Sequence, residues 1–154
     1  MNYTKNNYDF GNLDPWLSNL RDDLNLKGVS MGFARISAGR GYTFIHQHEK
    51  QEEVYVVLIG KGLIYIDGES IAMVPGDIIK VDAIARRSLK ADDELELVCS
   101  ILGGLPVEGF PRKASSSTLI DDGIPDWENL PHWCEGNEKA IEINKKLKAQ
   151  RGAD

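Results

Sequence analysis

The sequence is poor in cysteine, in basic surplus and in long apolar runs, and each shortage excludes a class of protein. Only Cys99 and Cys134 occur among 154 residues, too few for a secreted disulfide framework or a Cys-x-x-Cys metal knuckle. We therefore expect two free thiols and a cytoplasmic location. Acidic residues outnumber basic ones by 24 to 18, a formal net charge of −6, which repels phosphate backbones and anionic lipid surfaces. Nucleic acid and membranes are not expected partners.

No apolar run approaches the roughly 20 residues that a membrane-spanning helix needs. The first ten residues also lack the basic start and apolar stretch of a signal peptide. The hydrophobic fraction of 42% and the charged fraction of 27% are those of a soluble globular chain. At this length, we expect one domain over residues 1–154.

From residue 29 to about residue 104 the sequence consists of short apolar runs separated by glycine-containing or acidic turns, which is typical of β-strands. Eight strands with such short connections predict an all-β barrel or a pair of facing sheets, architectures that leave few exposed strand edges. The expected strands are Val29–Ile36, Tyr42–His48, Val54–Ile59, Leu63–Asp67, Ser70–Val74, Ile78–Val81, Arg86–Lys90 and Glu94–Leu102.

A short helix is expected on each side of this barrel core. Over residues 14–24, Asp14-Pro15 resembles a helix start, and apolar residues then recur at helical spacing. Over residues 135–150, apolar residues lie on one predicted face among lysines. The serine-rich stretch 114–118 between the barrel and the second helix is expected to be a surface loop.

The segment with the clearest chemistry contains two of the three histidines of the protein. His46 and His48 are two residues apart on a predicted strand, so their side chains project from the same face. A turn of four residues then brings Glu53 to the start of the next strand. Two imidazoles and one carboxylate on neighbouring strands form the donor set of a facial triad for a divalent metal ion.

The pattern His-x-His, four residues, Glu, six residues, Gly, which here runs from His46 to Gly60, resembles the first motif of the cupin superfamily. Residues 75–77, a Pro-Gly-Asp turn, and the strand after them resemble the second cupin motif. The resemblance covers about residues 41–100 and implies a double-stranded β-helix barrel, usually homodimeric, with a central ligand pocket. Where the family usually has a third metal-binding histidine this chain has Arg87, which has no lone pair to donate.

Each of these residues has an alternative interpretation. His46, His48 and Glu53 either bind a metal ion or form a vestigial pocket in which they hydrogen-bond one another. Glu49 and Glu52 are competing carboxylates, although the family pattern and the strand register both favour Glu53. The third histidine, His132, is interpreted as a surface or packing residue that could also serve as an extra ligand.

Arg87 is interpreted in three ways. It faces the pocket and holds a substrate carboxylate or phosphate with its fork, or it points outward, or it forms an internal ion pair with Glu53. Tyr55 shares the strand parity of Glu53 and would line the pocket, either as a substrate contact or as packing. The predicted substrate-binding residues are therefore Arg87 and Tyr55.

Fold alone does not determine function. The first hypothesis is a small cupin that binds a divalent metal ion (iron, manganese, nickel or zinc) and binds or acts on a small anionic organic molecule. If it is an enzyme, a dioxygenase or an isomerase fits the resemblance. The second hypothesis is a non-catalytic ligand-binding or sensor cupin, possible without metal.

Overall fold

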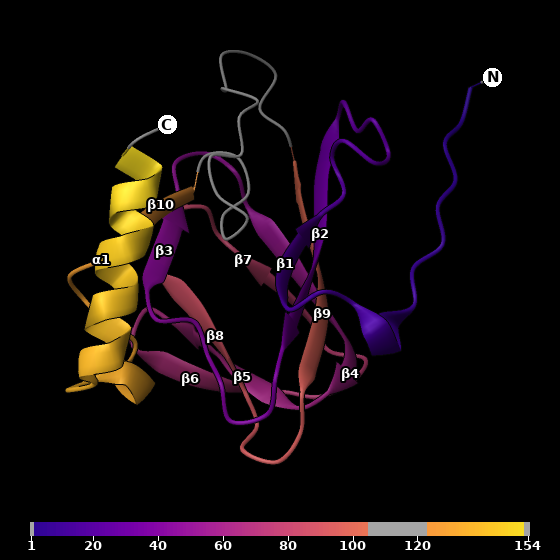
Figure 1. Ribbon diagram of the computed structural model, residues 1–154. Helices are drawn as coiled ribbons and strands as arrows, with labels where there is room; N and C mark the ends of the chain where they lie inside the picture. The colour runs from indigo at the N-terminus through magenta and orange to yellow at the C-terminus, as the bar shows by residue number, and fades with distance from the viewer. Residues whose placement is uncertain (1, 105–122, 153–154) are drawn as a thin grey trace.

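The computed structural model describes residues 2–104 and 123–152, and it shows two five-stranded antiparallel sheets that face each other (Figure 1). The first sheet has the strand order β1-β2-β9-β4-β7, and the second has the order β10-β3-β8-β5-β6. The strands are β1 (Trp16–Asn19), β2 (Val29–Ile36), β3 (Ile45–His48), β4 (Glu53–Gly60), β5 (Gly62–Ile66), β6 (Glu69–Met73), β7 (Ile78–Val81), β8 (Arg87–Ala91), β9 (Leu97–Gly104) and β10 (Gly123–Asp126). The all-β prediction is confirmed.

The expected strands correspond to β2 to β9, which run from Val29 to Gly104. The largest differences are in β9, which runs from Leu97 to Gly104 rather than from Glu94 to Leu102, and in β3, which begins at Ile45 rather than at Tyr42. Before β3, the chain makes only an isolated bridge, between Gly41 and Lys90. The sequence did not predict β1 and β10. Both are four-residue edge strands that are paired on one side only. Segments this short show no clear alternating apolar pattern, and β10 also contains a proline, which is tolerated at a sheet edge.

The predicted helix over residues 14–24 is wrong. A short 3₁₀ helix at Phe10–Asn12 and the strand β1 occupy this region instead. Trp16 to Asn19 pair with Arg35 to Gly32 of β2, so the segment satisfies the backbone groups of a sheet edge that a helix would leave open. Leu13 and Leu20 are buried with Phe33 and Val98 on the outer face of the first sheet. This tertiary pairing outweighs the weak local preference for helix.

The predicted C-terminal helix is present as α1 (Glu138–Gly152), which lies beside β3 and β10 in Figure 1. Its most buried side chains are Ala140 and Asn144, both 2% exposed, whereas the apolar Ile143 is 41% exposed. Asn144 bonds with Thr43 in both directions: its Nδ2 donates to the Thr43 carbonyl at 2.8 Å and its Oδ1 accepts from the Thr43 hydroxyl at 2.7 Å. A polar contact therefore attaches α1 to the barrel. Within the described part of the chain, no helix has the length and apolar character needed to cross a membrane.

The main core lies between the two sheets. Its buried residues include Val57 of β4, Ile64 of β5, Leu89 of β8 and Leu97 of β9, all of which point inward from alternating positions. The hairpin from β5 to β6 turns through Asp67 and Gly68, which both have positive φ, as a two-residue turn between twisted antiparallel strands requires. The predicted loop at residues 114–118 lies outside the described residues.

Candidate metal centre

Three polar side chains converge inside the barrel from two strands that are close in sequence. His46 and His48 lie on β3 with their side chains on the same face, and Glu53 is the first residue of β4. The His48 side chain is fully buried and that of Glu53 is 4% exposed, whereas the His46 side chain retains 17% exposure. The strand-register argument therefore holds for both histidines, and His46 lies on the more open side of the cluster.

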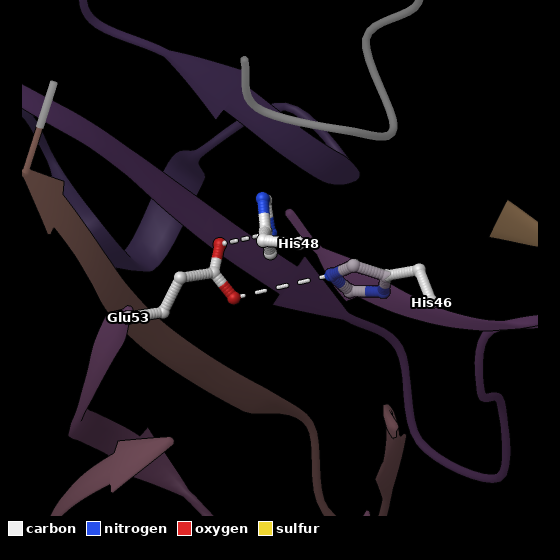
Figure 2. Close-up of side chains that lie close together, drawn as sticks. All are labelled: His46, His48 and Glu53. Atoms are coloured by element: carbon white, nitrogen blue, oxygen red, sulfur yellow. Dashed lines mark ion pairs between the residues drawn. The ribbon is translucent and has the colours of Figure 1, made fainter. Parts of the chain in front are cut away.

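The three side chains point toward one another, as Figure 2 shows. The Nε2 atom of His48 is 3.0 Å from Oε1 of Glu53, and the Nε2 atom of His46 is 3.9 Å from Oε2 of Glu53. One potential donor atom from each residue lies within 4.8 Å of the other two. Within the described residues this is the sole cluster of three such side chains with that geometry. These are the donor types and the proximity that a divalent metal centre requires.

Arg87 is also inside the barrel, where it forms an ion pair with Glu53. Its side chain is fully buried, and its Nη2 and Nε atoms donate to Oε2 of Glu53 at 2.9 and 3.2 Å. Its Nη1 donates to backbone carbonyls of the β7–β8 loop, those of Asp82, Ala83 and Ala85, at 3.3, 2.8 and 2.6 Å. Of the three interpretations of Arg87, the structure shows the internal ion pair.

Tyr55, two residues after Glu53 on β4, is 1% exposed and contacts the same carboxylate oxygen. Its hydroxyl donates to Oε2 of Glu53 at 2.6 Å. Oε2 thus accepts from both Tyr55 and Arg87, while Oε1 faces His48. A direct contact of Arg87 or Tyr55 with a substrate stays a prediction.

The environment of the cluster determines its protonation. Burial lowers the pKa of His46 to about 4, against the opposing influence of Glu53, so its imidazole is neutral near pH 7 and has a lone pair available. Burial by itself would raise the pKa of Glu53, but its contacts with His46 and His48 outweigh burial and hold that pKa well below its ordinary value. Neutral imidazole and ionised carboxylate are the forms that bind metal ions.

The other candidate ligands lie away from this cluster. Glu49 and Glu52, in the turn between β3 and β4, are exposed. His132 begins the 3₁₀ helix η2 (His132–Cys134), and its ring packs 6.2 Å from that of Tyr65 and 5.0 Å from that of Trp133. Of the three carboxylates, Glu53 is the one that lies in the cluster with His46 and His48. His132 is an exposed residue whose ring contacts those of Tyr65 and Trp133.

Comparison with known proteins shows what this chain is similar to. Residues 32–101 match the family model of the cupin domain. A cupin protein from Bacteroides fragilis is 28% identical, with a TM-score of 0.62, over 74% of this chain and 95% of that protein. Among curated protein sequences, none matches this chain significantly.

Two other similar structures have names that mention an activity. A proposed sugar phosphate isomerase from Acidithiobacillus ferrooxidans is 27% identical with a TM-score of 0.52, and 58% of each chain is covered. This chain thus spans little more than half of that protein. A predicted oxalate decarboxylase from Thermotoga maritima is 20% identical with a TM-score of 0.51, over 58% of this chain and 79% of that protein. The second likeness shows the fold alone.

Proposed function

The chain is a small cupin, and from this premise we propose that its barrel binds a divalent metal ion through His46, His48 and Glu53 and, at that ion, a small anionic organic molecule. The observation that carries the proposal is the convergence of the three donor groups within 4.8 Å of one another in a largely buried site. Two imidazoles and a carboxylate suit iron, manganese, nickel or zinc better than calcium or magnesium, which prefer oxygen ligands alone.

The contacts of Glu53 support a defined role for each of its oxygens. Oε2 is engaged by Arg87 and Tyr55, which orient the carboxylate. Oε1 lies toward His48 and is the oxygen we assign to the metal. Arg87 and Tyr55 thus position Glu53 for metal binding, in the way that outer hydrogen bonds orient metal-binding side chains. A bound ion would supply Lewis-acid chemistry to an oxygen of the small molecule.

The charge of the site supports an anionic ligand. Glu53 contributes one negative charge and Arg87 contributes one positive charge, so a divalent ion leaves the site with an excess of positive charge. Like charges repel strongly in a poorly solvated interior. An anion bound on the open side, toward the partly exposed His46, would relieve that repulsion. The likeness to a proposed sugar phosphate isomerase supports a small anionic substrate.

A metal-free binding or sensor function is the second candidate, and a specific observation favours it. The Arg87 guanidinium already neutralises Glu53 at 2.9 Å, so the buried carboxylate has a cation without any metal. In that case His46 and His48 would serve as hydrogen-bonding groups for a ligand. A cytoplasmic location and a homodimeric assembly stay predictions.

Metal analysis of chelator-treated protein, reloaded separately with iron, manganese, nickel and zinc, tests the proposal. We expect the wild type to retain a stoichiometric ion after desalting and the paired substitution His46→Ala with His48→Ala to retain none. His132→Ala, which removes the remaining histidine outside the cluster, is the matched control and should bind like the wild type. A folded wild-type protein that retains none of the four metals would instead support the metal-free candidate.

A further inference from the structure

A pocket lies outside the metal centre, between α1 and the segment that connects β2 to β3. Its volume is about 560 Å³, within the range of small-molecule sites. None of His46, His48 and Glu53 lines it. We propose that this pocket binds a small aromatic carboxylate, at a site independent of the metal centre.

Aromatic side chains form the barrel side of the pocket. Trp16 and Tyr42 have ring centroids 5.1 Å apart, and the indole Nε1 of Trp133 donates to the Tyr42 carbonyl at 2.8 Å. Gly41 permits that approach, because a Cβ atom at this position would lie 2.7 Å from the Trp133 Nε1. The aromatic wall is therefore held in place without a ligand, and its rings offer stacking or edge contacts to a flat apolar molecule.

The backbone of Trp16 supports a binding role for this wall. Trp16 has a φ of 70°, in the left-handed region that bulky side chains rarely adopt. Pairing of β1 with β2 holds it there, with Trp16 opposite Arg35. Such strain is concentrated at functional sites, and in this chain the strained residue packs against Tyr42 and lines the pocket.

Helix α1 forms the opposite side with apolar residues that are not fully used in packing. Ile143 is 41% exposed and lines the pocket together with Leu147. The helix is fixed by a different face, where Asn144 bonds with Thr43. The pocket therefore has two apolar walls, and the bonds between Asn144 and Thr43 fix the position of one wall relative to the other.

The charges around the pocket are of one sign. Arg40, Lys90 and Lys139 line it, and no acidic residue in the described part of the chain does, although the whole chain carries a net charge of −6. Lys90 bonds with Asp93 at 2.9 Å. The side chains of Arg40 and Lys139 form no ion pair or hydrogen bond with any described residue. Two cations beside an apolar cavity favour a carboxylate on an apolar body.

A neighbouring surface pocket, of about 390 Å³, differs in that its cations already have partners. Its two cations, Arg86 and Lys148, are already paired with Asp126 and Glu128, which line the same pocket. A ligand carboxylate there would have to displace an existing partner. This difference is why we assign the anion to the pocket with Arg40 and Lys139.

Calorimetric titration of the full chain with 2-naphthoate tests the proposal, with the neutral 2-naphthalenemethanol as the comparison ligand. We expect saturable binding of the carboxylate, and affinity lower by roughly tenfold for the alcohol and for the double variant Arg40→Gln with Lys139→Gln, since each loses charge-assisted hydrogen bonds. Lys148→Gln, on the same helix but at the other pocket, should bind 2-naphthoate like the wild type.

Two isoleucines of α1 provide a matched pair of variants. Ile141 and Ile143 are both 41% exposed, but Ile143 alone of the two lines the pocket. We expect Ile143→Glu to abolish 2-naphthoate binding, because it places a carboxylate in the cavity, and Ile141→Glu to leave binding intact. Circular dichroism of both variants would establish that α1 is retained.

The proposal is independent of the metal centre, so the protein with His46→Ala and His48→Ala should still bind 2-naphthoate. Loss of binding in that variant would place the ligand at the metal centre and overturn the assignment. Absence of binding in the wild type at millimolar ligand, or equal effects of Ile141→Glu and Ile143→Glu, would also overturn it. A further outcome would also overturn it: a wild type that is dimeric and binds no 2-naphthoate, together with an Ile143→Glu variant that is monomeric. A second copy of the chain would then cover this face.

Discussion

Arg87 of β8 donates from Nη2 to Oε2 of Glu53 of β4 at 2.9 Å, and the two residues belong to opposite sheets. The ion pair therefore links the two sheets through the barrel interior, beside the candidate metal ligands. Both side chains are almost fully excluded from solvent, the state in which the removal of one partner is most harmful.

Arg87→Met should destabilise the metal-free protein by about 3–5 kcal/mol, because it leaves an uncompensated carboxylate in a buried site. Urea denaturation monitored by circular dichroism, in the presence of a chelator, would measure the change in the free energy of unfolding. The double variant Arg87→Met with Glu53→Gln is the control. It has no buried charge, so it should lose less stability than Arg87→Met alone. A double variant at least as unstable as the single one would show that the ion pair does not account for the loss.

Gly60→Ala should lower the free energy of unfolding by more than the strain of a positive φ would lower it alone. Gly60 and Gly68 have φ of 81° and 99°, but a Cβ atom at Gly60 would lie 1.6 Å from the Glu96 carbonyl oxygen, whereas one at Gly68 meets nothing within 4 Å. Strain of this kind costs about 1–3 kcal/mol, which is our expectation for Gly68→Ala. Gly60→Ala should exceed it, since the backbone at Glu96, just before β9, must also move. Thermal unfolding of the two variants measures the difference, and equal losses would argue against the close approach.

Asn144→Ala should loosen the attachment of α1 to the barrel. The change removes the bonds with the Thr43 carbonyl and hydroxyl, and an unsatisfied buried partner costs about 1–3 kcal/mol. We expect that loss in urea denaturation, together with faster amide exchange in α1 than in β2 and β9. Glu142→Ala is the control, because Glu142 is exposed on the same helix. Unchanged exchange in α1 for Asn144→Ala would contradict the proposed attachment.

The two cysteines should resist alkylation in the folded protein. Burial raises the pKa of Cys99 to about 12 and also raises the pKa of Cys134, so little of the reactive thiolate is present at pH 8. Mass spectrometry after iodoacetamide treatment should show both thiols unmodified in native protein and modified in denaturant. Rapid native labelling of Cys99 would show that its strand opens readily.

The same shift predicts how stability depends on pH. A thiol whose folded pKa is raised contributes its full stabilisation below the unfolded value of about 9 and loses it as the pH rises toward about 12. Cys99→Ser, which has no titrating thiol, should therefore show a flatter decline in unfolding free energy over that alkaline range. An identical decline in both proteins would assign it to other groups.

Local patterns in the sequence were sufficient to predict strands β2 to β9 and the metal-ligand candidates. The two-residue repeat of a strand places His46 and His48 on one face, and the short turn after them returns Glu53 to the same place, so the spacing of three residues predicts their convergence. The same reasoning predicted the C-terminal helix from its apolar spacing, although the buried position on that helix is the polar Asn144. That the whole chain forms one domain stays a prediction.

The tertiary structure decided the features that depend on residues distant in sequence. Segment 16–19 is a strand because the edge of β2 is available to it, which no local pattern in the segment shows. Arg87 is an interior ion-pair partner rather than an outward side chain because Glu53 and three carbonyls of the β7–β8 loop surround its guanidinium. The aromatic pocket forms where α1 and Trp133 meet a loop about 90 residues earlier, and only the folded backbone brings such segments together.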